Sequence, residues 1–151
     1  MTDLTPDQKA RQAWLSLLAK SPPAALAEHC DALGTLPDHT WLQPPETGAV
    51  MVRGRTGGTG APFNLGEMTV TRCALTLETG EVGHGYVQGR DKSHAQRAAV
   101  VDALMQTDRA NEVRRAVLTP LETAMIAAKS ARAEKAAATK VDFFTMVRGE
   151  D

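Results

Sequence analysis

An alternating run of side chains between Glu67 and Leu77 constrains the fold of this chain more than any other feature. Threonine and β-branched residues are frequent in it, and one set of alternate positions holds Thr69, Thr71, Cys73, Leu75 and Leu77. A two-residue period of this kind predicts a β-strand. The segment 78–81 contains Gly80 and predicts a turn into a second strand over 82–88, so we expect a β-hairpin.

The hairpin leads directly into a predicted helix through Gly89, Arg90, Asp91, Lys92, Ser93 and His94. The free N–H groups and positive dipole end of a helix's first turn attract anions, and Arg90, Lys92 and His94 would add charge. The same residues also suit an ordinary helix start, in which Asp91 or Ser93 caps the helix and the cations are solvated. The local pattern leaves both interpretations open: a phosphate or phosphonate site, or a capped helix.

Four helices are predicted around these strands. The helix over 7–20 should turn one apolar face inward, formed by Ala10, Ala13, Trp14, Leu17 and Leu18. A second helix over 23–33 should bury Leu26 and Cys30 and end at Gly34, which would complete a helical hairpin. The helix over 92–106 should pack on the sheet through Ala98, Val101, Leu104 and Met105. A linker over 107–119 then leads into an alanine-rich helix over 119–138.

The predicted fold class is α+β, with helices packed on an antiparallel sheet, an N-terminal helical hairpin and a C-terminal helix followed by an extended tail. A further strand is expected over 48–54, after Pro44 and Pro45. The 151 residues are enough for one domain, so we expect a single domain over 1–151.

Composition excludes several functions. Seventeen basic and eighteen acidic residues leave a net charge of −1, and 4% aromatic residues are too few for a base-stacking surface, so nucleic acid is not an expected partner. The chain shows no secretion signal or membrane span, which makes the cytoplasm the expected compartment. Cys30 and Cys73 lack metal or redox spacing and are expected to be reduced thiols. The histidines are scattered, so we expect no metal held by this chain alone.

A second candidate anion site is the glycine-rich stretch 53–60, where Gly57, Gly58 and Gly60 lie beside Arg53 and Arg55. Backbone N–H groups in such a stretch can cradle an anion. The stretch lacks the lysine and the following helix of a P-loop. A flexible hinge or strained turn is the alternative interpretation.

The last eleven residues, 141–151, are unusually apolar for a chain terminus. The residues expected to make contact are Val141, Phe143, Phe144, Met146 and Arg148. An apolar tail can fold back on its own sheet or dock on another subunit, and exposed apolar patches commonly mark interfaces. The segment is therefore predicted to be a partner-docking tail, with docking on its own sheet as the alternative.

Together these motifs resemble the PhnG family, a subunit of the bacterial carbon–phosphorus lyase system. The resemblance covers nearly the whole chain and is weakest over 35–45, 61–65 and 107–119. The matching segments are 11–14, 46–48, 55–60, 66–72, 89–92, 94–95, 102–106 and 141–149. The combination and order of these segments are specific, although no single one is.

The resemblance implies a transferase subunit that acts with PhnH, PhnI and PhnL and is inactive alone. The complex would join methylphosphonate to C1′ of ATP and release adenine, before PhnJ cleaves the carbon–phosphorus bond. MgATP would be a substrate of the complex, and no cofactor is expected on this chain alone. The candidate anion contacts are Arg55, Gly57, Gly58, Gly60, Arg90, Lys92 and His94. A non-catalytic scaffold is the alternative, and an independent phosphotransferase ranks last because activating residues are missing.

Overall fold

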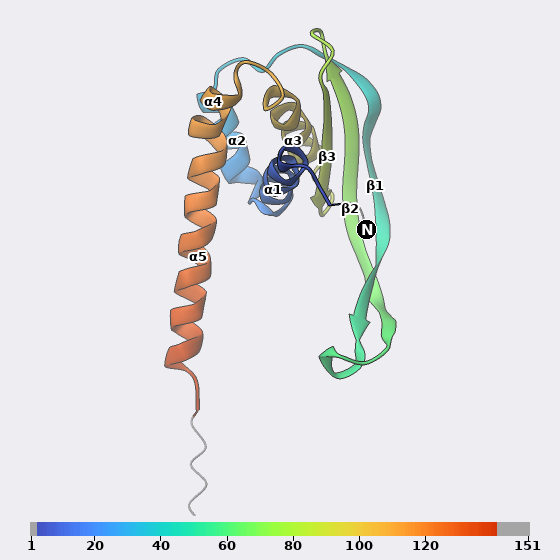
Figure 1. The fold of residues 1–151 in the computed structure, drawn as a ribbon, viewed down its shortest axis with the longest axis vertical. Coiled ribbons are helices and arrows are strands. Elements are labelled where there is room, and N and C mark those ends of the chain that lie inside the picture. The colour runs from blue at the N-terminus through green and yellow to red at the C-terminus, as the bar shows by residue number, and fades with distance from the viewer. Residues whose placement is uncertain (1–2, 142–151) are drawn as a thin grey trace, which may run out of the picture.

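The computed structural model describes residues 3–141 and confirms the predicted α+β class. Helices cover one face of a three-stranded antiparallel sheet (Figure 1). The elements in chain order are α1 (Pro6–Lys20), α2 (Pro23–Ala32), β1 (His39–Arg55), the short helix η1 (Thr56–Gly58), β2 (Pro62–Leu77), β3 (Val82–Gln88), α3 (Lys92–Leu104), α4 (Ala110–Val113), the π-helix η2 (Arg114–Leu118) and α5 (Thr119–Ala138).

The strands lie in the order β1-β2-β3, with β2 in the middle. The predicted alternation in β2 is confirmed, since Thr71, Cys73, Leu75 and Leu77 are buried on the face that the helices cover. The hairpin to β3 is also confirmed, and its turn contains Gly80 with a φ of 100°, a conformation that favours glycine. The sheet therefore supplies one wall of the core.

Strand β1 is much longer than the strand predicted over 48–54. It continues through Pro44 and Pro45, where the pairing with β2 shifts register. Proline lacks the N–H that a central strand requires, but an edge strand tolerates it at an irregular position. The two prolines therefore lie within this strand, whereas the sequence pattern suggested that the strand begins only after them.

Strands β1 and β2 extend well beyond β3, which pairs with β2 only from Val70 to Thr76. The residues 49–69 therefore form a two-stranded hairpin without a third strand, which we call the projecting ribbon. Figure 1 shows it reaching past the helical body, with the η1 loop at its tip. Isolated two-stranded hairpins are marginally stable in water, so this ribbon gains little support from the body.

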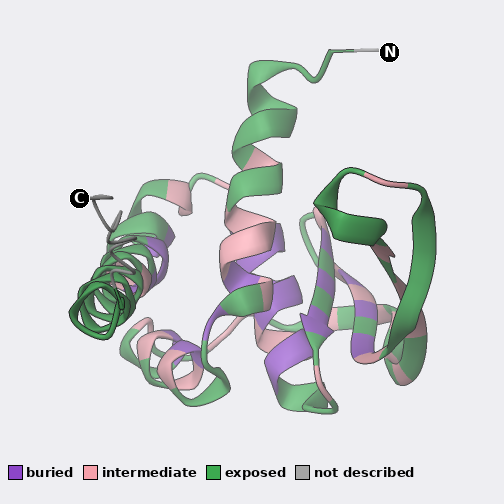
Figure 2. Ribbon diagram, turned by 90° about the horizontal axis from the view of Figure 1, so that it is seen from below, coloured by how far each residue is buried: buried purple, intermediate pink, exposed green. Residues whose placement is uncertain are grey.

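Helix α3 lies at the centre of the core. Its predicted inward face is confirmed, and the burial extends around the helix to His94, Ala95 and the whole of 98–104. The reason is that the sheet covers one side of α3 while α1 and α2 cover the other. Figure 2 shows the buried residues concentrated there, whereas the ribbon and most of α5 are exposed.

Two glycines in β3 allow α3 to lie directly against the strand. A Cβ atom added at Gly83 would collide with the carbonyl oxygen of Ala99, and one at Gly85 with that of Ala95. Both collisions involve helix backbone, which cannot move aside as a flexible side chain can. Gly83 and Gly85 thus serve helix packing.

The N-terminal helices are separated by two residues and both pack on α3, with α1 also against β3 and α2 also against η2. Thr5 and Gln8 form a reciprocal capping box at the start of α1, where Leu18 is the fully buried residue. Ala10 and Ala13 are exposed, which corrects the predicted apolar face: only its later part, nearer Leu18, reaches the core. In α2 the predictions are confirmed, because Leu26 and Cys30 are buried.

The predicted linker over 107–119 is largely helical. Helices α4, η2 and α5 follow one another without leaving helical backbone angles, and Val113, Val117 and Leu118 anchor this rod in the core. The boundaries predicted for α5 are confirmed, but Leu121 is its only buried residue. Figure 1 shows the rest projecting beyond the body. Among residues 3–141, no helix combines the length and apolarity needed to cross a membrane.

Substituting Gly85 with alanine should lower the free energy of unfolding by about 3 kcal/mol or prevent folding, because the new methyl group overpacks the α3 interface. Gly48→Ala is the matched control, since a Cβ there meets no atom within 4 Å and the φ is ordinary. Urea unfolding followed by circular dichroism measures both. Equal stability of the two variants would contradict the packing role of Gly85.

Both cysteines are buried free thiols, and burial raises the pKa of each to about 11. In the folded protein at pH 8, Cys30 and Cys73 should react with a thiol reagent at least tenfold more slowly than in urea, because the thiolate is the nucleophile. From about pH 9 to about pH 11 the unfolded chain releases protons that the folded chain retains, so stability should fall as the pH rises. Equal labelling rates in the folded protein and in urea would contradict the burial of the two thiols.

Candidate functional site

The predicted junction lies where β3 passes into α3. Gly89 has a φ of 99°, its N–H donates to the carbonyl of Thr69 at 2.9 Å, and its own carbonyl accepts from the Thr71 hydroxyl at 2.7 Å. Asp91 is the N-cap, since its carboxylate accepts from the N–H of His94 at 2.9 Å. Arg90 and Lys92 are exposed beside it. The cap leaves the N–H groups of Lys92 and Ser93 as those an incoming anion would use.

The side chain of His94 does not lie with the exposed cations at this junction. It is 2% exposed, and its Nε2 lies 2.9 Å from the carbonyl oxygen of Leu18 in α1. A carbonyl oxygen only accepts, so Nε2 carries a proton in this arrangement. Nδ1 is buried without a hydrogen-bond partner in the described part of the chain. Any anion contact by His94 would require a different side-chain orientation.

The glycine-rich candidate lies at the tip of the projecting ribbon. Gly57 and Gly58 have φ values of 62° and 84°, and the N–H of Gly60 donates to the carbonyl of Thr56 at 2.8 Å. Arg55 weakly contacts the carbonyl of Gly60 at 3.4 Å. The loop is thus a tight turn with an arginine across it, and its outer surface is exposed.

The structure does not bring the two candidate anion sites together. Gly89 lies beside Thr69, whereas Arg55 pairs with Pro62, seven residues further along β2. At about 3.3 Å per strand residue this separation is roughly 23 Å. A single phosphate or phosphonate therefore contacts one site or the other, unless another molecule connects them.

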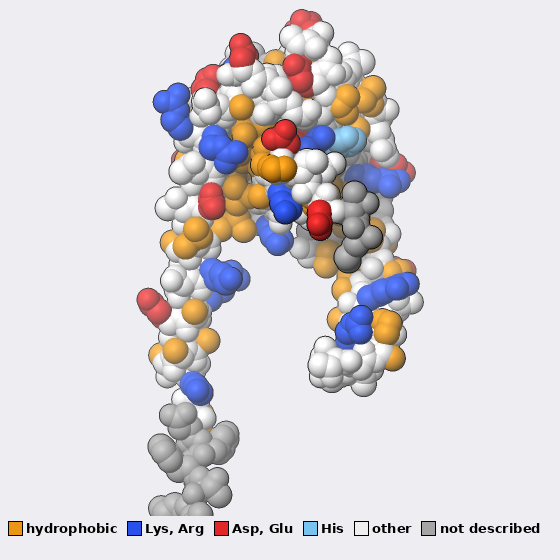
Figure 3. Space-filling view, viewed as in Figure 1, with side chains coloured by type: hydrophobic (Ala, Val, Ile, Leu, Met, Phe, Trp, Pro, Cys, Tyr) orange, Lys and Arg blue, Asp and Glu red, His pale blue; other side chains and the backbone are white. Residues whose placement is uncertain are grey.

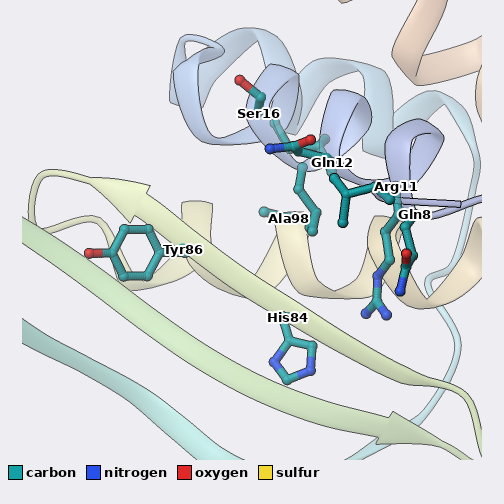
Figure 4. Close-up of a pocket in the computed structure, with 10 residues that line it drawn as sticks. Gln8, Arg11, Gln12, Ser16, His84, Tyr86 and Ala98 are labelled. Carbon is teal, nitrogen blue, oxygen red and sulfur yellow. The ribbon is translucent and has the colours of Figure 1, made fainter. Parts of the chain in front are cut away.

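A groove of about 600 Å³ lies between α1 and β3 and was not predicted. Figure 4 shows Arg11 extending from α1 toward β3, which carries His84 and Tyr86, with Gln12 and Ser16 further along α1. Most of the groove's surface is apolar, and its lining residues are Leu4, Gln8, Arg11, Gln12, Leu15, Ser16, Leu18, His84, Tyr86 and Ala98. This lining suits apolar side chains better than a triphosphate, which needs several cations and N–H donors.

Asp102, the partner of the groove residue Arg11, is a fully buried carboxylate. Arg11 donates to this carboxylate through Nε at 3.1 Å and Nη2 at 2.8 Å. The Trp14 indole N–H also donates to it at 2.8 Å, and so does the backbone N–H of His84 at 2.9 Å. The hydrogen bond to Asp102 raises the pKa of the Arg11 guanidinium above its ordinary value. One carboxylate thereby joins α1, β3 and α3.

The sequence reasoning missed this network. The available signal was the i,i+3 spacing of Arg11 and Trp14, which places a cation and an indole donor on the same side of one helix. Neither residue identifies its acceptor, which is remote in sequence. The network also ties the groove's geometry to the core, because Arg11 is both a wall residue and the partner of Asp102.

Few side chains in residues 3–141 are arranged for metal binding or nucleophilic catalysis. Within residues 3–141 there is no cluster of three or more histidine, cysteine or acidic residues that could hold a metal ion. Ser93 is exposed at the start of α3, while the neighbouring His94 ring is buried against Leu18, so they do not form a nucleophile–base pair.

The predicted docking tail falls mostly outside the described residues. Val141, the last of them, is 68% exposed. The other four contact candidates, Phe143, Phe144, Met146 and Arg148, lie beyond it. Their role as an interface stays a prediction.

Two comparisons with known proteins bear on the family to which this chain belongs. A family model described as "Phosphonate metabolism protein PhnG" matches residues 9–149. The alpha-D-ribose 1-methylphosphonate 5-triphosphate synthase subunit PhnG of Rhizobium meliloti (strain 1021) is 46% identical over 141 residues, covering 93% of this chain and 90% of that protein.

The match to the family model extends from α1 beyond the end of α5, so it includes every strand and the whole core. The chain is thus an α+β member of a family described as a phosphonate metabolism protein. It belongs to the PhnG family, as the sequence motifs indicated.

Asp102→Ala should lower the free energy of unfolding by about 3 to 5 kcal/mol, because it leaves Arg11, Trp14 and the His84 N–H without their acceptor. Glu112→Ala is the control: it removes the exposed Arg109–Glu112 pair, which solvent screens, and should leave the stability nearly unchanged. Chemical denaturation measures both changes. A loss below 1 kcal/mol for Asp102→Ala would show that the network does not hold the three elements together.

Proposed function

We propose that this chain acts with PhnH, PhnI and PhnL subunits to transfer the ribose triphosphate of ATP to methylphosphonate. The glycosidic bond from C1′ to adenine breaks, a phosphonate oxygen forms the new bond to C1′, and adenine leaves. The chain works in the cytoplasm within a core complex that also contains PhnJ, and it is inactive alone. The 46% identity to a PhnG synthase subunit over nearly the full chain is the observation that carries this proposal.

The structure supports a contribution by anion binding. The reaction must bring a triphosphate and a phosphonate together although both are negative, so cations and N–H donors are needed at the shared site. Arg90 and Lys92 are exposed at the start of α3, a helix whose dipole favours anions at that end. The ribbon tip offers Arg55 with Gly57, Gly58 and Gly60. We assign one substrate anion to the α3 start and leave the ribbon tip as a second contact. Mg²⁺ would enter with ATP as part of the substrate.

The alternative function is a non-catalytic scaffold that only organises the larger subunits. The observation that favours it is the lack of a metal-ligand cluster in residues 3–141, together with the burial of the His94 ring. In this case α5, the projecting ribbon and the segment 141–151 would contact the larger subunits. The two functions differ in whether a point variant that assembles normally loses activity.

Arg90→Ala should raise the KM of the assembled complex for ATP or methylphosphonate about tenfold, because a charge-assisted hydrogen bond contributes about 1.5 to 3 kcal/mol. Adenine release in the presence of methylphosphonate measures it, with size-exclusion chromatography as the check on assembly. Arg114→Ala, also exposed and of equal charge change, is the control. Unchanged kinetics for Arg90→Ala in an intact complex would support the scaffold instead.

Removing residues 141–151 should abolish co-purification with the PhnI subunit while leaving the chain folded, because no described core residue lies in that segment. A matched variant that keeps the length but replaces Phe143 and Phe144 with serine separates the effect of the apolar side chains from that of chain length. Normal co-purification of both variants would contradict the docking role of the tail.

A further inference from the structure

Two parts of the chain project from the same end of the body and border one gap. They are the projecting ribbon, 49–69, and α5, and Figure 3 shows them as two arms with open space between. Neither arm is stabilised by the body along most of its length: the ribbon has only two strands, and α5 buries one residue. Which side chains border the gap decides what it can hold.

The gap side of α5 is basic. Leu121 marks the side of α5 that rests on the body, and further along the helix this same side borders the gap. At about 100° per residue, Arg132 lies roughly 20° and Lys135 roughly 40° from Leu121 around the helix axis. Glu134 lies about 140° away, on the outer side. Glu134 is thus turned away from the gap, and Arg132 and Lys135 face the gap.

The ribbon is basic as well. Arg53 and Arg55 are two residues apart on β1, so their side chains leave the strand on one face, and both are exposed. The segment 50–66 contains no acidic residue.

The width of the gap separates a macromolecular occupant from a small anion. The sheet, α3 and the α4–α5 rod form successive layers with about 10 Å between neighbours, which sets the arms roughly 20 Å apart. After the side chains of both arms are allowed for, this suits one helix, whose diameter is about 10 to 12 Å. A phosphate group is much smaller and cannot contact both arms at once.

We propose that the two arms grip an acidic helix or ridge of a different protein subunit, with Arg132 and Lys135 on one side and Arg53 and Arg55 on the other. The inference rests on the assembly part of the proposed function and not on its reaction. Both arms present positive charge to the gap region, so an acidic occupant is attracted from both sides.

Matched variants of α5 test the inference. Arg132→Ala with Lys135→Ala removes two positive charges from the gap side, while Ser130→Glu with Ala137→Glu makes the same net change on the outer side, about 160° to 180° from Leu121. All four substitutions introduce good helix formers. Association of the tagged chain with the complex of the other co-expressed subunits is titrated at several salt concentrations.

The gap-side variant should bind the partner complex at least tenfold more weakly at low salt and show a weaker salt dependence, whereas the outer-side variant should bind within twofold of wild type. Arg53→Ala, on the other arm, should weaken binding in the same direction. Equal binding by the gap-side and outer-side variants would overturn the inference. So would normal assembly with only a raised KM for ATP, which would identify a small anion as the occupant.

Two further outcomes separate this inference from others. Salt-dependent self-association of the chain alone, seen by analytical ultracentrifugation and lost in the gap-side variant, would make a second copy the occupant and overturn the proposal. Charge-dependent assembly into a complex that releases no adenine would overturn the proposed reaction and leave the acidic partner standing. Adenine release by a complex whose assembly does not depend on these charges would overturn the acidic partner and leave the proposed reaction standing.

Discussion

The close contact between α3 and β3 is the constraint on which the rest of the structure depends. The helix backbone reaches the strand only because Gly83 and Gly85 have no side chains. Once α3 lies there, α1 and α2 pack on its other side and the α4–α5 rod packs at its end. Asp102 then fixes α1 relative to β3 through a carboxylate that is fully surrounded by donors. A small, rigid body results, from which the ribbon and α5 project.

This division between body and arms separates two kinds of stability. The body has a continuous apolar core, whereas the arms expose most of their surface. Surfaces of this kind gain order from a partner, so the energy that holds the arms in place belongs to the assembly more than to the chain. Anion contacts at the α3 start would be positioned by the body, while contacts at the ribbon tip would be positioned by whatever the arms hold.

The sequence predicted elements well where one signal dominated. Helix α5 has the predicted bounds because threonine and proline start it and alanines favour it throughout. The strand over 39–47 was missed because Pro44 and Pro45 look like breakers, and only its place at the sheet edge makes them acceptable. The helical character of 107–119 was missed because a π-helix does not follow the 3.6-residue period. Asp102 and His94 depend on partners in α1 that are distant in sequence, so local patterns could not reveal their burial.

The π-helix η2, at Arg114–Leu118, determines which way α5 faces. A π-turn contains one residue more than an α-turn, so it changes the phase of every residue that follows by about 100°. Deleting one residue from η2 would turn it into an ordinary α-turn and remove one residue at the same time, so the two changes of phase cancel and α5 keeps its direction. Deleting a residue from the α-helical stretch before Arg132 would instead rotate the rest of α5 by about 100° and carry its cations to another side. The π-turn can therefore absorb a change of length that the regular part of the helix cannot.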